Sequence, residues 1–393
     1  MRFRWNNITK LALIFFFSNL YFYLPILTLF YQQRGLNIFQ INSLQGILIG
    51  TIFFTNIPTG IFADKYGRKI TIIIALLLQL LGEILFLFAY GYLAFVFICI
   101  IAGLGFSFMT GTVSALIYET LKKEQKENEM QKAVGTKVAF ERAAGIIAPL
   151  AVSFYVTSFA MNKFNFLIIL TIFFVAISLF ISFFLEEPTH LQEVKKKTSS
   201  LNIIKDGLTL LKNNKSLKRI VLLSLFAYPL MAYLFILYQP YFVKSQVPSY
   251  LFGILLAVSS LVSLLSSKYT YKLEQKFGME KTVFIVTLLP GLMYIIMALI
   301  FHPIFSPLLF CLIYFPIGMY EPLFSDYQNR HIESGNRATV LSMISMFSNA
   351  YIVIMGLIIG LIADKSISYA FIFMGLIILF GSFAFRLNKN HLQ

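Results

Sequence analysis

The chain has 393 residues, of which 58% are hydrophobic and only 12% are charged, and its formal net charge is +15. This composition excludes a water-soluble globule with an ordinary surface. The basic residues are scattered over short segments instead of gathering with aromatics on one face, so the charge does not indicate nucleic-acid binding.

Twelve apolar segments follow one another along the chain, each long enough to cross a bilayer, which takes about 20 mostly apolar residues. They cover residues 11–31, 42–63, 70–90, 92–118, 138–160, 165–185, 220–243, 249–267, 281–301, 304–327, 338–363 and 367–386. The sequence therefore predicts an all-α membrane protein with twelve transmembrane helices.

The longest polar interval divides these segments into two sets of six. We expect an N-terminal bundle over residues 1–185, a cytoplasmic linker over 186–219 and a C-terminal bundle over 220–393. In the linker, four apolar residues fall at helical spacing: Leu201, Ile204, Leu208 and Leu211. This spacing predicts a short helix on the membrane surface, and a solvated linker is the alternative.

The distribution of basic residues predicts the orientation. With both termini in the cytoplasm, only Arg34, Lys163, Lys244 and Lys365 lie outside, which is the positive-inside pattern. The first apolar run is too long for a signal-peptide core, so no cleavage is expected. We therefore expect an integral protein of a bacterial inner membrane.

The stretch GIFADKYGRK, residues 60–69, joins the second and third apolar segments. Gly60 lets helix backbones approach closely. Asp64 can face the amino end of another helix, which favours a carboxylate by about 0.3–1 kcal/mol. Gly67 permits a turn that other residues resist, and Arg68 and Lys69 add cytoplasmic positive charge. An ordinary positive-inside loop is the alternative interpretation.

These five residues match every fixed position of the pattern Gly-x-x-x-Asp-x-x-Gly-Arg-Lys/Arg, so the chain resembles the major facilitator superfamily of secondary transporters. The segments ALIYETL (115–121) and RATVLS (337–342) resemble a bacterial exporter-like branch of that family. The resemblance implies that Asp64 faces the helix start near Ala338 and that Arg68 pairs with Glu119. Together these groups would form a latch that is made in one conformation and broken in another.

Two exporter signatures are incomplete. In the fourth segment, Cys99 and Ala102 stand where proton-coupled exporters of the family carry Arg and Gln before Gly103. In the fifth segment, the family's glycine series from Gly135 is retained in spacing and in Pro149, but alanines replace two glycines and the final glycine pair is lost to Val152 and Ser153. This partial match favours export over import.

Ionisable residues inside apolar segments suggest coupling groups, because a charge near the bilayer centre costs about 2.5–3.5 kcal/mol. Glu83 lies well inside the third segment, four residues after Gln79, and is predicted to exchange protons. The alternative is a neutral acid that is hydrogen-bonded to a neighbour such as Gln79. Glu321 is a second candidate for proton exchange or for a gate. Arg142 is either a snorkelling boundary residue or an anchor for an anionic substrate.

The resemblance implies a central cavity lined by the first, fourth, seventh and tenth helices. Candidate lining residues are aromatic, Met or polar: Asn19, Tyr21, Tyr23, Ser107, Met109, Arg142, Tyr228, Met231, Tyr233, Tyr314 and Tyr320. Such side chains suit a small amphipathic organic solute, although some of them are expected to pack between helices instead.

No enzymatic constellation is visible, since the four histidines lie far apart and no phosphate-binding glycine loop is present. We expect no cofactor and no metal. The sequence predicts a monomeric secondary transporter that moves a small-molecule substrate across the lipid bilayer by alternating access, with proton-coupled efflux as the mode. The alternatives are a metabolite, peptide or siderophore permease or uniporter, and, from other classes, a membrane sensor without transport or an intramembrane enzyme.

Overall fold

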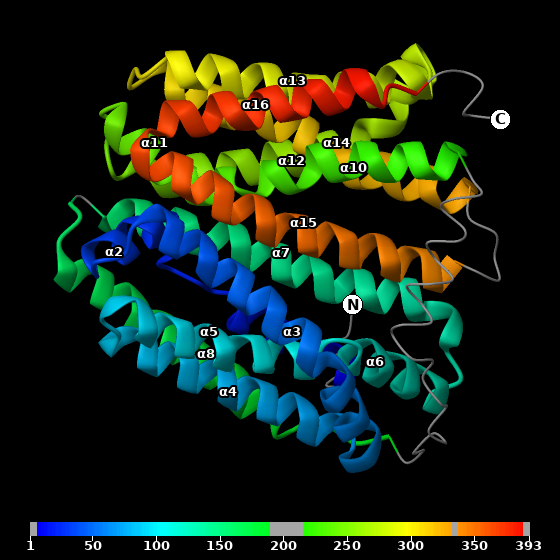
Figure 1. The fold of residues 1–393 in the computed structure, drawn as a ribbon. Coiled ribbons are helices and arrows are strands. Elements are labelled where there is room, and N and C mark those ends of the chain that lie inside the picture. Colours follow the sequence, from blue (N-terminus) through cyan, green and yellow to red (C-terminus); the bar gives the residue numbers. More distant parts are fainter. Residues whose placement is uncertain (1–5, 157, 189–214, 332–336, 388–393) are drawn as a thin grey trace. The chain divides into compact units, whose positions relative to one another are not determined.

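The computed structural model describes residues 6–156, 158–188, 215–331 and 337–387, and the chain is helical and free of strands within these ranges (Figure 1). The predicted surface helix of the linker, with Leu201, Ile204, Leu208 and Leu211, lies outside the described residues.

The chain forms two compact units, and each unit includes one short segment whose sequence neighbours belong to the other unit. Unit 1 comprises Met1–Leu36, Leu44–Lys195 and Phe252–Ala257. Unit 2 comprises Asn37–Ser43, Lys196–Leu251 and Val258–Gln393. Each unit is described by itself below.

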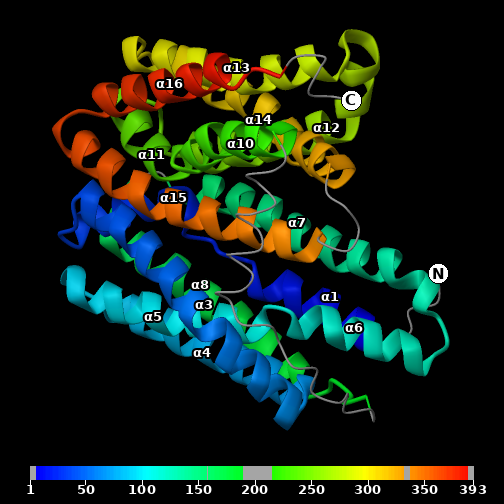
Figure 2. The same cartoon turned by 45° about the vertical axis from the view of Figure 1, so that its right-hand side comes forward.

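Unit 1 contains eight α-helices, one of which begins in unit 2. They are α1 (Asn7–Ser18), α2 (Leu27–Gln33), α3 (Ile38–Tyr66), α4 (Arg68–Phe88), α5 (Gly91–Met109), α6 (Thr112–Lys123), α7 (Met130–Tyr155) and α8 (Met161–Ser182). Two 3₁₀ turns, Leu24–Ile26 and Glu127–Glu129, precede α2 and α7. Helix α4 packs against α5 and α8, and α1 packs against α7 and α8 (Figure 2).

Unit 2 contains seven described helices, one of which has its first turns in unit 1. They are α10 (Lys215–Ala232), α11 (Leu234–Lys244), α12 (Leu251–Phe277), α13 (Met279–Leu299), α14 (Phe305–His331), α15 (Arg337–Lys365) and α16 (Ile367–Ala384). Helix α13 packs most extensively against α16, and both lie side by side in Figure 2.

Ten described helices or helix pairs are long and apolar enough to cross a membrane, and a bent pair, Val221–Ala232 with Leu234–Lys244, raises the number to eleven. The first predicted span, 11–31, is not one rod. It is broken into α1, a 3₁₀ turn and α2, and α1 has only 12 residues. A helix of that length rises about 18 Å, less than the roughly 30 Å of a bilayer core.

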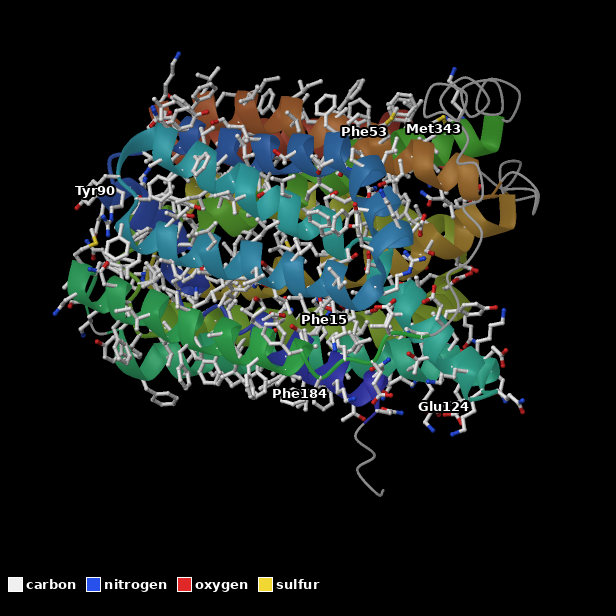
Figure 3. The ribbon with its side chains drawn as sticks, turned by 90° about the horizontal axis from the view of Figure 1, so that it is seen from below. Phe15, Phe53, Tyr90, Glu124, Phe184 and Met343 are labelled. Atoms are coloured by element: carbon white, nitrogen blue, oxygen red, sulfur yellow. The ribbon has the colours of Figure 1, made fainter. Side chains whose placement is uncertain are left out.

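Each unit has its own apolar core, and large apolar side chains also cover the outer surface. The core of unit 1 includes Leu11, Ile72 and Leu116, and the core of unit 2 includes Met319 and Tyr327. Outward-facing aromatics include Phe53 and Phe184, each 49% exposed, and Figure 3 shows both at the outside of the ribbon. Exposed rings of this kind suit contact with lipid tails, since a water-soluble monomer rarely exposes so much apolar surface.

Candidate functional site

The turn between α3 and α4 is a single residue, Gly67, whose φ of +96° is rarely adopted by residues with a side chain. Its carbonyl oxygen accepts the Thr71 hydroxyl at 2.6 Å, which fixes the first turn of α4. Gly278 makes the equivalent one-residue turn between α12 and α13, with φ +77° and ψ 159° against ψ 161° at Gly67. The two glycine turns therefore share one backbone geometry.

Three side chains that the sequence singled out meet beside this turn in unit 1. Arg68 Nη1 lies 2.7 Å from Asp64 Oδ1 on the preceding helical turn. Arg68 Nε lies 3.3 Å from Oε1 of Glu119, which comes from α6. The Glu119 side chain is 8% exposed and that of Arg68 is 13% exposed. One guanidinium therefore bridges two carboxylates in a largely desolvated setting, where ion pairs are stronger than at a surface.

Glu187, which sequence reasoning missed, completes this group. Its Oε1 accepts the Arg68 amide and its Oε2 accepts the Lys69 amide, both at 2.7 Å. The carboxylate thus satisfies the exposed amides at the amino end of α4, where a negative charge is favoured. A Cβ at Gly67 would lie 2.8 Å from Glu187 Cδ, so glycine is also needed for this approach. We call Asp64, Arg68, Glu119 and Glu187 the Arg68 cluster.

The neighbouring residue Glu186 binds the start of α1. Its carboxylate lies 2.9 Å from Nζ of Lys10, a side chain that is only 3% exposed. This ammonium group lowers the pKa of Glu186. The Asn7 side chain also donates to the Glu186 carbonyl at 2.8 Å and accepts the Glu186 amide at 2.9 Å. Residues 186 and 187 thereby hold the segment that follows α8 against both α1 and α4.

The remaining residues of the predicted latch are placed as follows. Gly60 lies one helical turn before Asp64 on α3, and Lys69 contributes its amide to Glu187. Ala338 lies in the first turn of α15, in unit 2, whereas Asp64 lies in unit 1. The contact between Asp64 and the start of α15 stays a prediction.

Glu83 is buried in α4, with 8% of its surface exposed. Both carboxylate oxygens accept the Tyr23 hydroxyl, at 2.9 Å each. Among the described residues, no Lys, Arg or His nitrogen lies within 4.0 Å of this carboxyl group. An ionised carboxylate buried without a cation is costly, so such a group tends to hold a proton.

Glu83 is hydrogen-bonded to Tyr23 and not to Gln79, the neighbour that the alternative interpretation named as an example. The Gln79 amide instead donates to the Tyr21 hydroxyl at 2.7 Å and to the Ser18 carbonyl at 2.8 Å. Ser18 ends α1, so Gln79 binds the chain at the point where the first apolar segment breaks. Tyr21 and Tyr23 pack edge to face, with ring centroids 5.9 Å apart. The break in the first segment thus places two tyrosines against α4.

The other candidates in unit 1 are dispersed. Asn19 donates to the Phe15 carbonyl at 2.8 Å and so caps the end of α1. Ser107 is 1% exposed and contacts the Thr59 hydroxyl at 2.8 Å, between α5 and α3. Met109 packs at the edge of the apolar core. Arg142 is exposed on α7.

In unit 2, several candidates belong to the packed interior. Met231 and Tyr320 lie in the apolar core, and Tyr320 stacks on Phe324 with ring centroids 4.0 Å apart. The Tyr233 hydroxyl donates to the Ile352 carbonyl on α15. Tyr314 is half-buried on α14 and packs against a neighbouring ring. Glu321 is exposed, and the Tyr228 side chain lies outside what the structure describes.

Comparison with known proteins identifies the family. The profile of the Major Facilitator Superfamily matches residues 11–349. The uncharacterized MFS-type transporter YxaM of Bacillus subtilis (strain 168) is 22% identical over 346 residues, which are 86% of this chain and 84% of that protein.

Solved transporter structures share the fold at low sequence identity. A mutant of the nucleoside transporter NupG has a TM-score of 0.80 at 15% identity, and the match covers 97% of this chain and 99% of that one. A POT family transporter in complex with 5-aminolevulinic acid has a TM-score of 0.72 at 15% identity, with 96% and 94% covered. A bacterial homolog of the human lysosomal transporter Spinster also scores 0.72, at 12% identity, with 96% and 95% covered.

These relatives are transporters and not enzymes, and the described helices are those of an integral membrane protein. The family profile matches far more than half of the sequence, including the Gly60–Lys69 motif and both carboxylates that contact Arg68. The chain is therefore a transporter that belongs to the major facilitator superfamily.

Proposed function

We propose that the chain exports a small amphipathic organic solute in exchange for protons, by alternating access. In this proposal twelve spans form an N-terminal half (residues 1–185) and a C-terminal half (220–393), joined by the linker 186–219. Both termini face the cytoplasm of a bacterial cell, and the protein acts as a monomer in the inner membrane. A broken first span, α1 with α2, and the bent pair of α10 and α11 would complete the twelve.

The observation that carries the proposal is the setting of Glu83. The carboxyl group is buried in α4, and its hydrogen-bond donor is the neutral hydroxyl of Tyr23. The charge would thus be poorly compensated, whereas the protonated acid is neutral and fits the site. A change in hydration around Glu83 during transport would therefore favour uptake of a proton in one state and release in another.

Through Tyr23, a change in the protonation of Glu83 would affect the structure of the first span. When Glu83 is ionised, the Tyr23 hydroxyl donates to it, and protonation adds a donor on the carboxyl group itself. Tyr23 lies in the irregular segment between α1 and the 3₁₀ turn Leu24–Ile26. The protonation of Glu83 would thereby be coupled to the break in the first span, which is bound a second time through Tyr21 and Gln79.

The Arg68 cluster is proposed to act as the latch of the conformational cycle. Asp64 would engage the amino end of α15 in one state, and Arg68 would hold Asp64 in place through its pairing with Glu119. We expect Asp64→Asn and Arg68→Ala to abolish transport while the protein still reaches the membrane. Wild-type transport rates in both variants would remove the latch from the mechanism.

Export and the substrate class rest on the sequence. The glycine series of the fifth span is partly retained, with Ala144, Ala148 and Pro149 all buried in α7. The candidate cavity residues are rich in tyrosine and methionine, which suits a solute with both apolar and polar parts.

The test is uptake into inverted membrane vesicles with and without an imposed pH gradient. The solutes are a panel of hydrophobic cations, neutral drugs and anions. We expect acidification of the vesicle interior to drive accumulation of at least one class, and Glu83→Gln to abolish that accumulation. Glu127→Gln is the matched control, because Glu127 is exposed between α6 and α7. Solute uptake that is the same with and without the pH gradient would contradict proton coupling and favour a uniporter.

A further inference from the structure

The motif at the end of α3 has a close copy at the end of α15. Residues 60–65 read GIFADK and residues 360–365 read GLIADK. Each copy closes a helix of 29 residues, since α3 ends at Tyr66 and α15 at Lys365. The shared Gly-x-x-x-Asp spacing puts the glycine and the carboxylate one turn apart on the same helix face.

In the second copy, the carboxylate is bound to a helix amino terminus. Asp364 Oδ1 accepts the Ile38 amide at 2.7 Å, and Oδ2 accepts the Phe39 amide at 3.2 Å. Ile38 and Phe39 are the first two residues of α3. They belong to the segment Asn37–Ser43, which lies in unit 2 together with α15. A carboxylate is favoured here because the helix amino end carries partial positive charge.

Asp364 adds to a cap that α3 already supplies from its own sequence. Asn37 Oδ1 accepts the Gln40 amide at 2.8 Å, and Gln40 Oε1 accepts the Asn37 amide at 3.1 Å. This reciprocal pair is a capping box. It leaves the amides of Ile38 and Phe39 free for Asp364, so the end of α3 is prepared for an external carboxylate.

Gly360 makes this contact possible. A Cβ built at position 360 would lie 2.6 Å from Phe39 Cα and 3.1 Å from Asn42 Nδ2. Because the nearest atom is backbone, any larger residue would push α3 and α15 apart. Asn42 is 2% exposed, and neither polar atom of its amide has a partner among the described residues. An unsatisfied buried amide is costly, so this contact is less stable than one in which every polar atom has a partner.

We infer that Gly360, Asp364 and the first turn of α3 form a second latch, at the opposite end of α3 from Asp64. This inference rests on the proposed alternating-access function. Residues 38 and 64 are about 39 Å apart along the helix. Residues 37–43 belong to unit 2 and residues 44–66 of α3 belong to unit 1. A movement that carries all of α3 with unit 1 must therefore break the Asp364 contact.

In this proposal each copy of the motif stabilises a different end state of the transport cycle. The Asp364 contact stabilises one end state through α3's first turn, and Asp64 stabilises the other through the helix start that contains Ala338. A lost capping carboxylate changes an equilibrium by about two- to fivefold. Asp364→Ala is expected to shift the ratio of closed to open states at this end of α3 by that factor, and Gly360→Ala by at least as much.

The experiment measures spin-label distances in the full chain in lipid nanodiscs. Labels are placed at Gln45→Cys on α3 and Tyr369→Cys on α16, two exposed positions, after Cys99 and Cys311 are changed to Ser. Asp364→Asn is a milder variant for the case that Asp364→Ala folds poorly.

Gly50→Ala is the matched control, because a Cβ at this glycine of α3 meets no atom within 4 Å. We expect the Asp364 and Gly360 variants to enlarge the population of molecules with a long distance between the labels at positions 45 and 369. Gly50→Ala should leave this population unchanged. Unaltered distances in the Asp364 and Gly360 variants, or an equal shift in Gly50→Ala, would overturn the latch. Transport of the same variants separates the two proposals. Unaltered distances in these variants, together with proton-driven transport by the wild-type chain, refute the latch alone, whereas a wild-type chain without any proton-driven transport refutes the proposed function.

Discussion

Glu187 should contribute measurably to the stability of unit 1, although nothing in its local sequence indicates a role. Its two oxygens accept the first two amides of α4 at 2.7 Å. Replacing a capping side chain by Ala typically costs about 0.5–2 kcal/mol, and a carboxylate at a helix amino end adds about 0.3–1 kcal/mol. We therefore expect Glu187→Ala to destabilise unit 1 by about 1–2 kcal/mol.

The chain carries its own reporters for this measurement. Cys99 lies in α5 of unit 1 and Cys311 in α14 of unit 2, and neither of them forms a disulfide bond. A fluorogenic maleimide reacts with each cysteine as the surrounding helices open on heating. With Cys311→Ser as background, the transition seen at Cys99 should fall by about 2–8 °C in Glu187→Ala. With Cys99→Ser as background, the transition seen at Cys311 should move less.

A matched control and a graded variant sharpen the test. Glu127→Ala removes an exposed carboxylate, so it should leave the Cys99 transition in place. Glu187→Gln keeps one acceptor oxygen but loses the charge, so its effect should fall between those of wild type and Glu187→Ala. If Glu187→Ala and Glu127→Ala give the same Cys99 transition as wild type, the capping role of Glu187 is refuted.

Three further predictions concern unit 1. Gly67→Ala should destabilise by at least about 1–2 kcal/mol, because φ is +96° and the new Cβ would meet Glu187; an unchanged thermal transition would contradict this. Tyr23→Phe removes the donor to Glu83, and a hydrogen bond to a charged group contributes about 1.5–3 kcal/mol, so proton-driven transport should fall about tenfold or more. Undiminished transport would argue against this pair. Lys10 lowers the pKa of Glu186, so their pairing stabilises the fold above the ordinary Glu pKa of 4.5 and is lost as pH falls through the lowered value. Glu186→Gln should therefore destabilise the protein at neutral pH and flatten the dependence of thermal stability on pH below 4.5, and an unchanged pH profile would contradict the pairing.

Hydropathy predicted most of the membrane-crossing helices but not their breaks. The segment 11–31 is mostly apolar, yet α1 ends at Ser18 and α2 begins only at Leu27. Asn19 turns its amide back to the Phe15 carbonyl, and Pro25 lacks an amide hydrogen, so both interrupt the helix although the segment as a whole remains apolar. The segment 220–243 is broken in the same way at Tyr233, with a bend of 43° after Pro229.

The candidate site, too, was predictable from the sequence only where its residues lie close together along the chain. Gly67, Asp64 and Arg68 lie within one motif, so their spacing alone brings them together. The partners that complete the site are distant in sequence: Glu187 is 119 residues from Arg68, and Tyr23 is 60 residues from Glu83. A single sequence carries no signal for such pairs. The copy of the motif at Gly360–Lys365 was readable in the sequence, but its significance depends on the contact of Asp364 with α3.

The central claim, that Glu83 carries the coupling proton, is tested most directly by comparing two transport modes in proteoliposomes. Proton-driven accumulation requires Glu83 to gain and lose a proton, whereas counterflow exchange of labelled for unlabelled solute requires only movement of the loaded carrier. With a solute taken from the vesicle panel, Glu83→Gln should abolish accumulation and retain counterflow, because the amide mimics the protonated acid. Proton-driven accumulation at the wild-type rate in Glu83→Gln would contradict the claim.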